Sequence, residues 1–279
     1  MITTRRTYMP LATYPEAVAD EAVLAAAGFA ISLGGALEVT TFSVDIPRVP
    51  SPLASMLIDI PGLVRAAEDK SKSECSRLQS LVRAVGSPPT VTCTSREVLL
   101  SGILDAAAAE ARYYDLAVLP WSREEASAQH LIEAVVFGSG RPAILVPSSA
   151  RPAARLEHIA IAWDASRVAA RALGDALPLL ADGGRVTVLT VGDEKPLAGA
   201  ALASLLASSL EKRGVKAHPI EITLGEKTIA QALQEKALAE GAQMLAMGGF
   251  GHSRIRDFVL GGATTGVFAD LRLPVLLSH

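Results

Sequence analysis

The chain has 279 residues, of which 50% are hydrophobic and 4% aromatic, and its formal net charge is −3. This length suits one large or two ordinary domains, and a core built mainly from Ala, Leu, Val and Ile suits layers of helix and sheet. The small acidic excess argues against general nucleic-acid binding, which needs a basic surface.

The sequence also bears on location. Cys75 and Cys93 belong to no CxxC motif, so we expect free thiols in a reducing cytoplasm, with Cys75 inert and partly exposed on a helix. Residues 22–37 are uncharged, but they fall short of the roughly 20 residues that a membrane span needs and contain two adjacent glycines. No signal peptide precedes them. We therefore expect a cytoplasmic protein without membrane contact.

In the first half, an apolar stretch predicts a strand at 8–11, and Pro15 predicts a helix that begins near it, because proline suits the first helical position. Apolar residues recur along one face of that helix, namely Val18, Ala22, Ala25, Phe29 and Leu33. The other predicted elements are strands at 37–44, 91–94, 116–119 and 143–146, and helices at 63–85, 101–111 and 131–137.

After a linker at 148–155, the series starts again. Thr228 and Gln231 have the spacing of a capping box, and Gly241 suits the end of the same helix. The elements predicted for this half are strands at 158–163, 186–191, 215–222, 244–247 and 275–277, and helices at 166–180, 197–212, 228–240 and 263–270.

Both halves thus alternate strand and helix, and residues 141–147 resemble the closing residues 273–277. Alternation predicts a parallel sheet with helices on both faces, and the duplication predicts two tandem domains. In such sheets ligands bind at the carboxyl ends of strands, where the strand order reverses. The fold class is therefore α/β, with two doubly wound domains of five strands each.

The stretch 244–266 is the strongest functional signal. A buried strand is followed by a glycine loop, a glycine turn and the start of a helix. Glycines allow close approach of the backbone, and amides at a helix N-terminus suit phosphate, so a nucleotide-phosphate site is predicted. A plain surface turn is the alternative. The P-loop is excluded because Val267 stands where its lysine should be, and the dinucleotide fingerprint because the glycines follow the fourth strand.

The spacing Gly248-x2-Gly251-x9-Gly261-Gly262 resembles the nucleotide motif of the universal stress protein family, and so do 161–166 and 191–193. The chain is identified by this resemblance as a tandem universal stress protein. The resemblance implies domains at 1–149 and 155–279 with a fold like that of the adenine nucleotide alpha hydrolases, packed as a pseudo-dimer through their last strands. It implies ATP or another adenine nucleotide as ligand, with or without magnesium.

By this resemblance, the adenosine end would contact Asp164 and Val191, and the residues around the phosphates would be Met247, Gly248, Gly251, His252, Gly261, Gly262, Ala263 and Thr264. For Asp164, a helix N-cap is the alternative role. Gly262 departs from the family, which has Ser or Thr there, and the lost hydrogen bond would weaken binding about tenfold. We predict Trp121 and Trp163 to be packing residues.

The first half departs further from the motif. Ala12 stands in the place of the aspartate, and Pro120 follows the fourth strand where glycine is needed. We therefore predict that residues 1–149 form a degenerate domain without a nucleotide site.

The expected function is regulatory nucleotide binding in a stress response, and a homodimer of the tandem chain is left open. One alternative is a nucleotide-free adaptor, in which Gly262 marks the loss of binding. The other is slow ATP hydrolysis through Asp164 or His252. No catalytic residue or metal site is assigned, because no triad, paired carboxylates or His/Cys cluster is present.

Overall fold

The computed structural model describes residues 4–47, 59–87, 90–122, 126–151, 154–192, 199–249, 266–267 and 269–279. The strands of the first half are β1 (Arg6–Ala12), β2 (Ala36–Asp45), β3 (Val91–Leu99), β4 (Leu116–Trp121) and β5 (Ala143–Pro147). Those of the second half are β6 (His158–Ala162), β7 (Arg185–Val191), β8 (Lys216–Ile222), β9 (Met244–Gly248) and β10 (Val275–Ser278). The α-helices are α1 (Asp20–Ser32), α2 (Ile60–Val85), α3 (Ile103–Ala111), α4 (Ala126–Gly138), α5 (Arg167–Ala176), α6 (Gly199–Glu211) and α7 (Ile229–Ala239).

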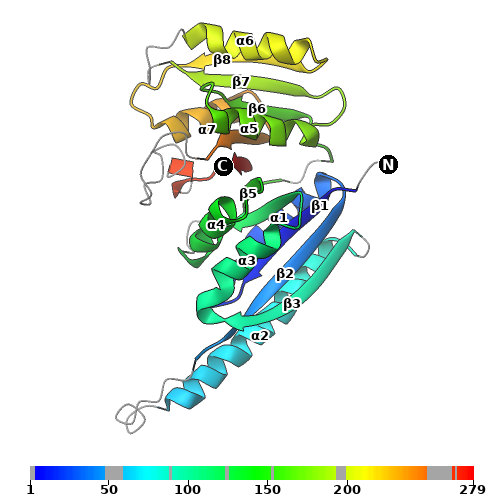
Figure 1. The fold of residues 1–279 in the computed structure, drawn as a ribbon, viewed down its shortest axis with the longest axis vertical. Helices are drawn as coiled ribbons and strands as arrows, with labels where there is room; N and C mark the ends of the chain where they lie inside the picture. Colours follow the sequence, from blue (N-terminus) through cyan, green and yellow to red (C-terminus); the bar gives the residue numbers. More distant parts are fainter. Residues whose placement is uncertain are drawn as a thin grey trace.

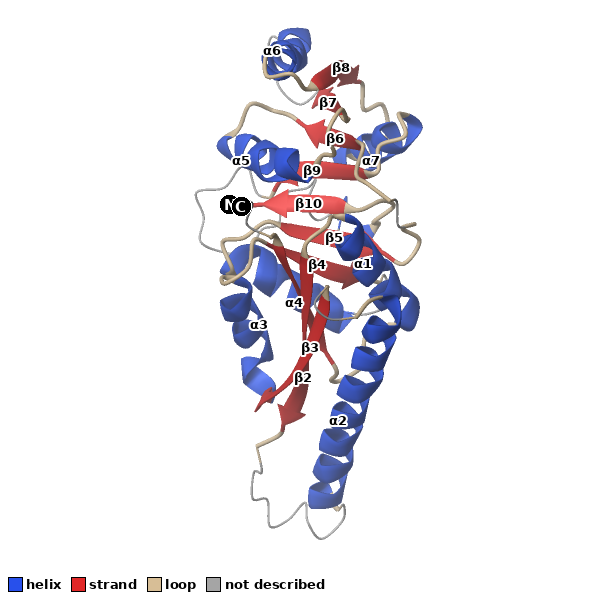
Figure 2. Cartoon of the chain, turned by 90° about the vertical axis from the view of Figure 1, so that its right-hand side faces the viewer, coloured by secondary structure: helices blue, strands red, loops and turns tan. Residues whose placement is uncertain are grey.

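All described strands join one twisted sheet in the order β3-β2-β1-β4-β5-β10-β9-β6-β7-β8 (Figure 1). Each half contributes five parallel strands in the same relative order. The halves meet where β5 pairs antiparallel with β10, and these two strands lie side by side in the middle of the sheet (Figure 2). The predicted α/β fold with two doubly wound halves is confirmed.

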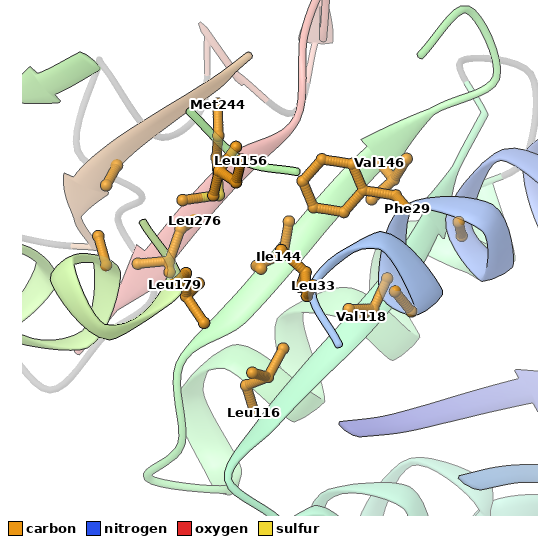
Figure 3. Close-up of a cluster of buried hydrophobic side chains, with 14 of the residues drawn as sticks. Phe29, Leu33, Leu116, Val118, Ile144, Val146, Leu156, Leu179, Met244 and Leu276 are labelled. Carbon is orange, nitrogen blue, oxygen red and sulfur yellow. The ribbon is translucent and has the colours of Figure 1, made fainter. Parts of the chain in front are cut away.

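We call the β5–β10 junction the seam, and hydrophobic packing continues across it. Phe29 of α1 and Leu33, the residue that follows this helix, lie in the same buried cluster as Leu156 and Leu276 of the second half (Figure 3). On the same face, the Arg5 guanidinium donates hydrogen bonds to the carbonyl oxygens of Leu33 at 2.7 Å and Pro178 at 2.6 Å. The two halves are therefore joined by backbone pairing, apolar contact and a side-chain bridge.

Helix α1 begins five residues later than Pro15 predicts. Residues 14–16 form a bend, and the helix starts at Asp20 after Ala19, whose carbonyl accepts from the first amides. Asp20 and Glu21 occupy the first turn, where carboxylates are stabilised by the positive end of the helix. The predicted apolar face is confirmed, because all five of its residues are buried.

Several elements of the first half are longer than predicted, including α4, which begins at Ala126 rather than at 131; β3 and α2 show the physical reasons. Strand β3 continues past residue 94 through a polar segment to Leu99, since β2 pairs with it over its whole length. Helix α2 begins at Ile60 rather than at 63: Asp59 caps it by accepting from the Gly62 amide at 2.9 Å, and Pro61 fits its first turn. Helix α2 extends beyond the ends of β2 and β3 (Figure 1).

Helix α7 has both signals that the sequence predicts. The Thr228 and Gln231 side chains form the capping box, and Gly241 has a φ of 75°, which favours glycine. Among the described residues, no helix is both long and apolar enough to cross a membrane.

Candidate functional site

The candidate site lies at the carboxyl ends of three adjacent strands of the second half. Strand β6 lies between β7 and β9, and the strand order reverses there, because the chain returns from β8 to the far side of β6. Asp164 follows β6, Val191 ends β7 and Gly248 ends β9. The structure thus brings three of the predicted site residues to one edge, at the switch point where ligands of such sheets bind.

Asp164 is exposed in the turn between β6 and α5. Its Oδ1 accepts a hydrogen bond from the Ser166 amide at 2.9 Å, whereas the Ser166 hydroxyl caps α5 by accepting from the Ala169 amide at 3.1 Å. The N-cap interpretation of Asp164 is therefore wrong, because the helix starts two residues later than that role requires. Ala165, next to it, has a φ of 60°, a left-handed conformation that costs a non-glycine residue about 1–2 kcal/mol.

Gly248 has a packing reason to be glycine. A Cβ built there would lie 2.6 Å from Val168 Cγ2 and 2.8 Å from the Val168 carbonyl carbon, so the first turn of α5 rests directly on the strand end. Met247, also predicted at the site, has its side chain buried in the core and pairs with Leu277 of β10. Packing of these two residues therefore fixes the position of the end of β9.

Val191 is half-buried and packs against the core cluster on the α7 face of the sheet. The next residue is Gly192, whose amide donates to the Ile222 carbonyl at 3.1 Å. A Cβ on Gly192 would meet the Glu221 carboxylate at 2.6 Å, so this carboxylate lies close beside the main chain. The end of β7 offers a ligand mainly backbone groups and one neighbouring negative charge.

Most of the glycine motif lies outside the described residues, including six predicted site residues: Gly251, His252, Gly261, Gly262, Ala263 and Thr264. The ends of this stretch are described. The Gly249 amide donates to the Ser278 carbonyl at 2.8 Å, and Gly266 rests against Ala230 in the first turn of α7. The convergence of the two glycine turns on one ligand stays a prediction.

The two halves can be matched residue by residue, because their inter-strand hydrogen bonds repeat. In the first half, the amides of Asp115, Ala36 and Ala117 donate to the carbonyls of Arg6, Arg5 and Pro142, respectively. In the second half, the amides of Gln243, Arg185 and Leu245 donate to the carbonyls of His158, Glu157 and Pro274 at the matching places. The site positions of the second half therefore have counterparts of a different kind in the first: Ala12 for Asp164, Phe42 for Val191 and Pro120 for Gly248.

In the first half, the corresponding edge is filled by the protein's own side chains. Phe42 is fully buried, and its carbonyl accepts a hydrogen bond from the Thr13 hydroxyl at 2.8 Å. Ser71 of α2 completes the chain, because its Oγ lies 2.6 Å from Thr13 Oγ1 and accepts from the Val44 amide at 3.0 Å. Since Thr13 uses its only proton on Phe42, Ser71 donates to Thr13, and every polar group in this chain has a partner.

Helix α2 also determines the setting of Cys75, one turn beyond Ser71. The thiol is buried, with Sγ at 3.9 Å from Thr13 Oγ1, so the predicted partial exposure is wrong. The helix face that carries Cys75 packs over β2 and β3. The many charged residues on the other faces of α2 make this buried face hard to predict from the sequence. Trp121 and Trp163 pack against the core clusters, as predicted.

His158 lies on a site strand but at the opposite end of β6, where burial lowers the pKa of the imidazole and Nε2 lies 2.8 Å from Thr187 Oγ1. Within the described ranges, no group of three or more His, Cys, Asp or Glu residues could hold a metal ion. The described part of the site is an edge made of the Asp164 carboxylate, the neighbouring Glu221 carboxylate and backbone groups.

Comparison with known proteins agrees with this organisation. Residues 155–279 match the model of the Universal stress protein family. A universal stress protein from Archaeoglobus fulgidus DSM 4304 superimposes with a TM-score of 0.69 at 18% identity, over 97% of each chain. A protein of unknown function from Pseudomonas aeruginosa PAO1 gives a TM-score of 0.51 at 14% identity, over 99% of this chain and 92% of its own.

No curated protein matches the sequence. The likeness to the Archaeoglobus protein extends over both halves, and at this identity it establishes the fold. Residues 155–279 form a domain of the universal stress protein family, within a chain whose whole length has the fold of a solved universal stress protein.

Proposed function

We propose that residues 155–279 bind one adenine nucleotide at the carboxyl ends of β6, β7 and β9. The observation that carries this proposal is the meeting of Asp164, Val191 and Gly248 at the switch point of the sheet. An acidic residue in such a position suits the hydroxyl groups of a ribose, and main-chain groups at the end of β7 suit the adenine edge. The Asp164 carboxylate has no ion-pair partner among the described residues, so it is available to a ligand.

The phosphates would extend toward the glycine motif. There the amides of Gly251, Gly261, Gly262 and Ala263 and the hydroxyl of Thr264 are the proposed donors, with His252 beside them. Any magnesium would be held largely by the phosphates, because Mg²⁺ in nucleotide sites usually binds one or two carboxylates plus phosphate oxygens.

The first half would serve as a structural partner without a nucleotide. The filled edge formed by Thr13, Phe42 and Ser71 supports this assignment, because no donor or acceptor in that hydrogen-bond chain is free. The role that fits a universal stress protein is regulatory: nucleotide occupancy of the second half would favour one conformation of the chain or one set of partners over another.

Calorimetric titration of the full-length chain with ATP, ADP and AMP tests the proposal. We expect one nucleotide per chain and about tenfold weaker binding in Asp164→Asn, which loses the acceptor charge. Asp182→Asn is the matched control, because this exposed residue precedes β7 at the opposite edge of the sheet. Equal affinity of the two variants would contradict the role of Asp164, and two nucleotides per chain would contradict the filled first half.

Two other functions are outcomes of this experiment and its extension. Absence of heat at millimolar nucleotide would favour the nucleotide-free adaptor. If the wild type turns over ATP at steady state and Asp164→Asn or His252→Ala lowers the rate, the result would favour slow hydrolysis. A rate unchanged in both variants would contradict the hydrolysis hypothesis.

A further inference from the structure

A cavity of about 190 Å³ lies on the seam, at the amino ends of β9 and β10. This edge is opposite to the one that carries Asp164 and Gly248. The first half contributes the end of α1, the linker contributes residues 149–151, 155 and 156, and the second half contributes the end of α7 and the approaches to β9 and β10. A ligand in the cavity would therefore touch both halves.

The charge around this cavity has one sign. Three arginines line it and no acidic residue does, namely Arg151, Arg155 and Arg272, although the chain as a whole has 29 acidic and 26 basic residues. Arg272 is neutralised, because it pairs with Glu235 at 2.9 Å and with Asp270 at 2.8 Å. Arg151 and Arg155 form no ion pair within the described residues, so two positive charges are left for an anion.

The main chain that carries Arg155 is held in place. Gln243 Oε1 accepts from the amides of Glu157 at 2.6 Å and His158 at 3.0 Å, and its Nε2 donates to the Arg155 carbonyl at 2.9 Å. The Gln243 amide group thereby ties the linker to the approach of β9. Because the backbone is fixed at Arg155 and at the two residues that follow it, Arg155 loses less entropy on binding an anion than a residue on a free loop does.

The other walls are apolar. Phe29 of α1 and Leu156 of the linker are buried side chains that lie at the seam (Figure 3) and also line the cavity. Leu238, at the end of α7, lines it too and remains 45% exposed. Pro274 and Leu273 add to the same wall. An apolar body placed here would cover surface that water now meets.

We propose that this cavity binds a small organic anion, whose carboxylate or phosphate group meets Arg151 and Arg155 and whose apolar body contacts Phe29, Leu156 and Leu238. Guanidinium groups match the geometry of carboxylates and phosphates. A cavity of roughly 150 Å³ holds a benzene ring, so the volume here suits one ring or a short branched chain together with its acidic group. This site is separate from the proposed nucleotide site and does not depend on it.

Titration of the full-length chain with phenyl phosphate and with phenylacetate, followed by calorimetry, tests the proposal. We expect saturable binding with one site per chain. The variants Arg151→Gln and Arg155→Gln should each weaken binding about tenfold, as expected for loss of a charge-assisted hydrogen bond. Arg213→Gln removes the same charge from the exposed end of α6 and should leave the affinity unchanged.

Two further measurements separate this site from the nucleotide site and from general charge attraction. Asp164→Asn should bind phenyl phosphate like the wild type, and excess ATP should not displace it. Inorganic phosphate and benzyl alcohol should each bind at least tenfold more weakly than phenyl phosphate. Inorganic phosphate keeps only the contacts to the arginines, and benzyl alcohol keeps only the contacts to the apolar wall. Displacement by ATP, equal affinity of inorganic phosphate, unchanged affinity in both arginine variants, or no binding of either probe at millimolar concentration would overturn the proposal.

Discussion

The two halves of the chain share a strand order and inter-strand hydrogen bonds, yet their carboxyl edges differ. In the second half this edge presents the exposed Asp164 and the half-buried Val191. In the first half the counterparts are Ala12 and the fully buried Phe42, beneath a hydrogen-bond chain that ends at Ser71. Two similar backbones therefore carry different side chains at the carboxyl ends of their strands.

Helix α2 contributes to the difference together with the residues at the strand ends. It carries Ser71 and Cys75 over the end of β2, where they meet Thr13. The residues between β7 and α6, 193–198, lie outside the described part of the chain. The carboxyl edge of the first half is thus covered by side chains of a neighbouring helix as well as by its own strand residues.

The largest expected effect tests the filled edge. Phe42→Ala should lower the free energy of unfolding by about 3–5 kcal/mol, because it removes a fully buried aromatic ring. Val191→Ala, the counterpart in the second half, should cost only about 1 kcal/mol, because fewer buried methyl groups are lost. Urea unfolding of both variants measures the contrast. Similar losses would show that the two edges are packed alike.

The next effect concerns the contact between α5 and β9. Gly248→Ala should cost about 1–3 kcal/mol, because its Cβ would lie 2.6 Å from Val168 Cγ2 and 2.8 Å from the Val168 carbonyl carbon, so the backbone of α5 must shift. Gly249→Ala is the adjacent control, since its nearest neighbour would be 3.5 Å away, an ordinary contact. Chemical denaturation of the pair decides: equal stability would argue against close packing at Gly248.

An effect of similar size is expected within the hydrogen-bond chain of the first half. Ser71→Ala leaves the buried Val44 amide without its acceptor and should cost about 1–3 kcal/mol. Ser76→Ala, on the exposed side of the same helix, should change stability by less than about 0.5 kcal/mol. If Ser71→Ala were as stable as Ser76→Ala, the hydrogen-bond chain through Ser71 would contribute nothing to the stability of this edge.

The smallest effect is a difference in pH dependence. Burial lowers the pKa of His158 in the folded state, so its stabilising contribution is complete above the unfolded pKa of about 6.5 and is lost as the pH falls toward the folded pKa. Its counterpart in the first half, Arg6, stays charged throughout. Unfolding of His158→Gln between pH 5 and pH 7.5, roughly the window of histidine titration, should show a flatter pH profile than the wild type.

That difference should amount to about 1 kcal/mol, since one proton changes stability by at most about 1.4 kcal/mol per pH unit. His130→Gln provides the control, because this histidine is exposed on α4 and should leave the profile as it is in the wild type. Parallel profiles for wild type and His158→Gln would assign the pH dependence to other groups.

Much of the fold could be predicted from the order of the residues. Short, mostly apolar or β-branched runs predicted the positions of the described strands, and the apolar spacing of residues 18–33 predicted the buried face of α1. The predicted start of α1 is wrong because Pro15 suits the first position of a helix, whereas the acidic residues Asp20 and Glu21 mark the actual first turn. The alternative role of Asp164 as a helix cap is wrong for a similar reason, since Ser166 is an equally good cap and lies where the helix begins.

The sequence by itself determined the alternation of strand and helix, the duplication and the residues that differ between the halves, because these depend on local propensity and periodicity. Only the tertiary structure decided that β3 continues through a polar segment, that α2 buries Cys75, and that Ser71 closes the edge beside Phe42. Each of these depends on a partner distant in the chain: a neighbouring strand that supplies hydrogen bonds, or a helix face whose burial is fixed only when the layers pack.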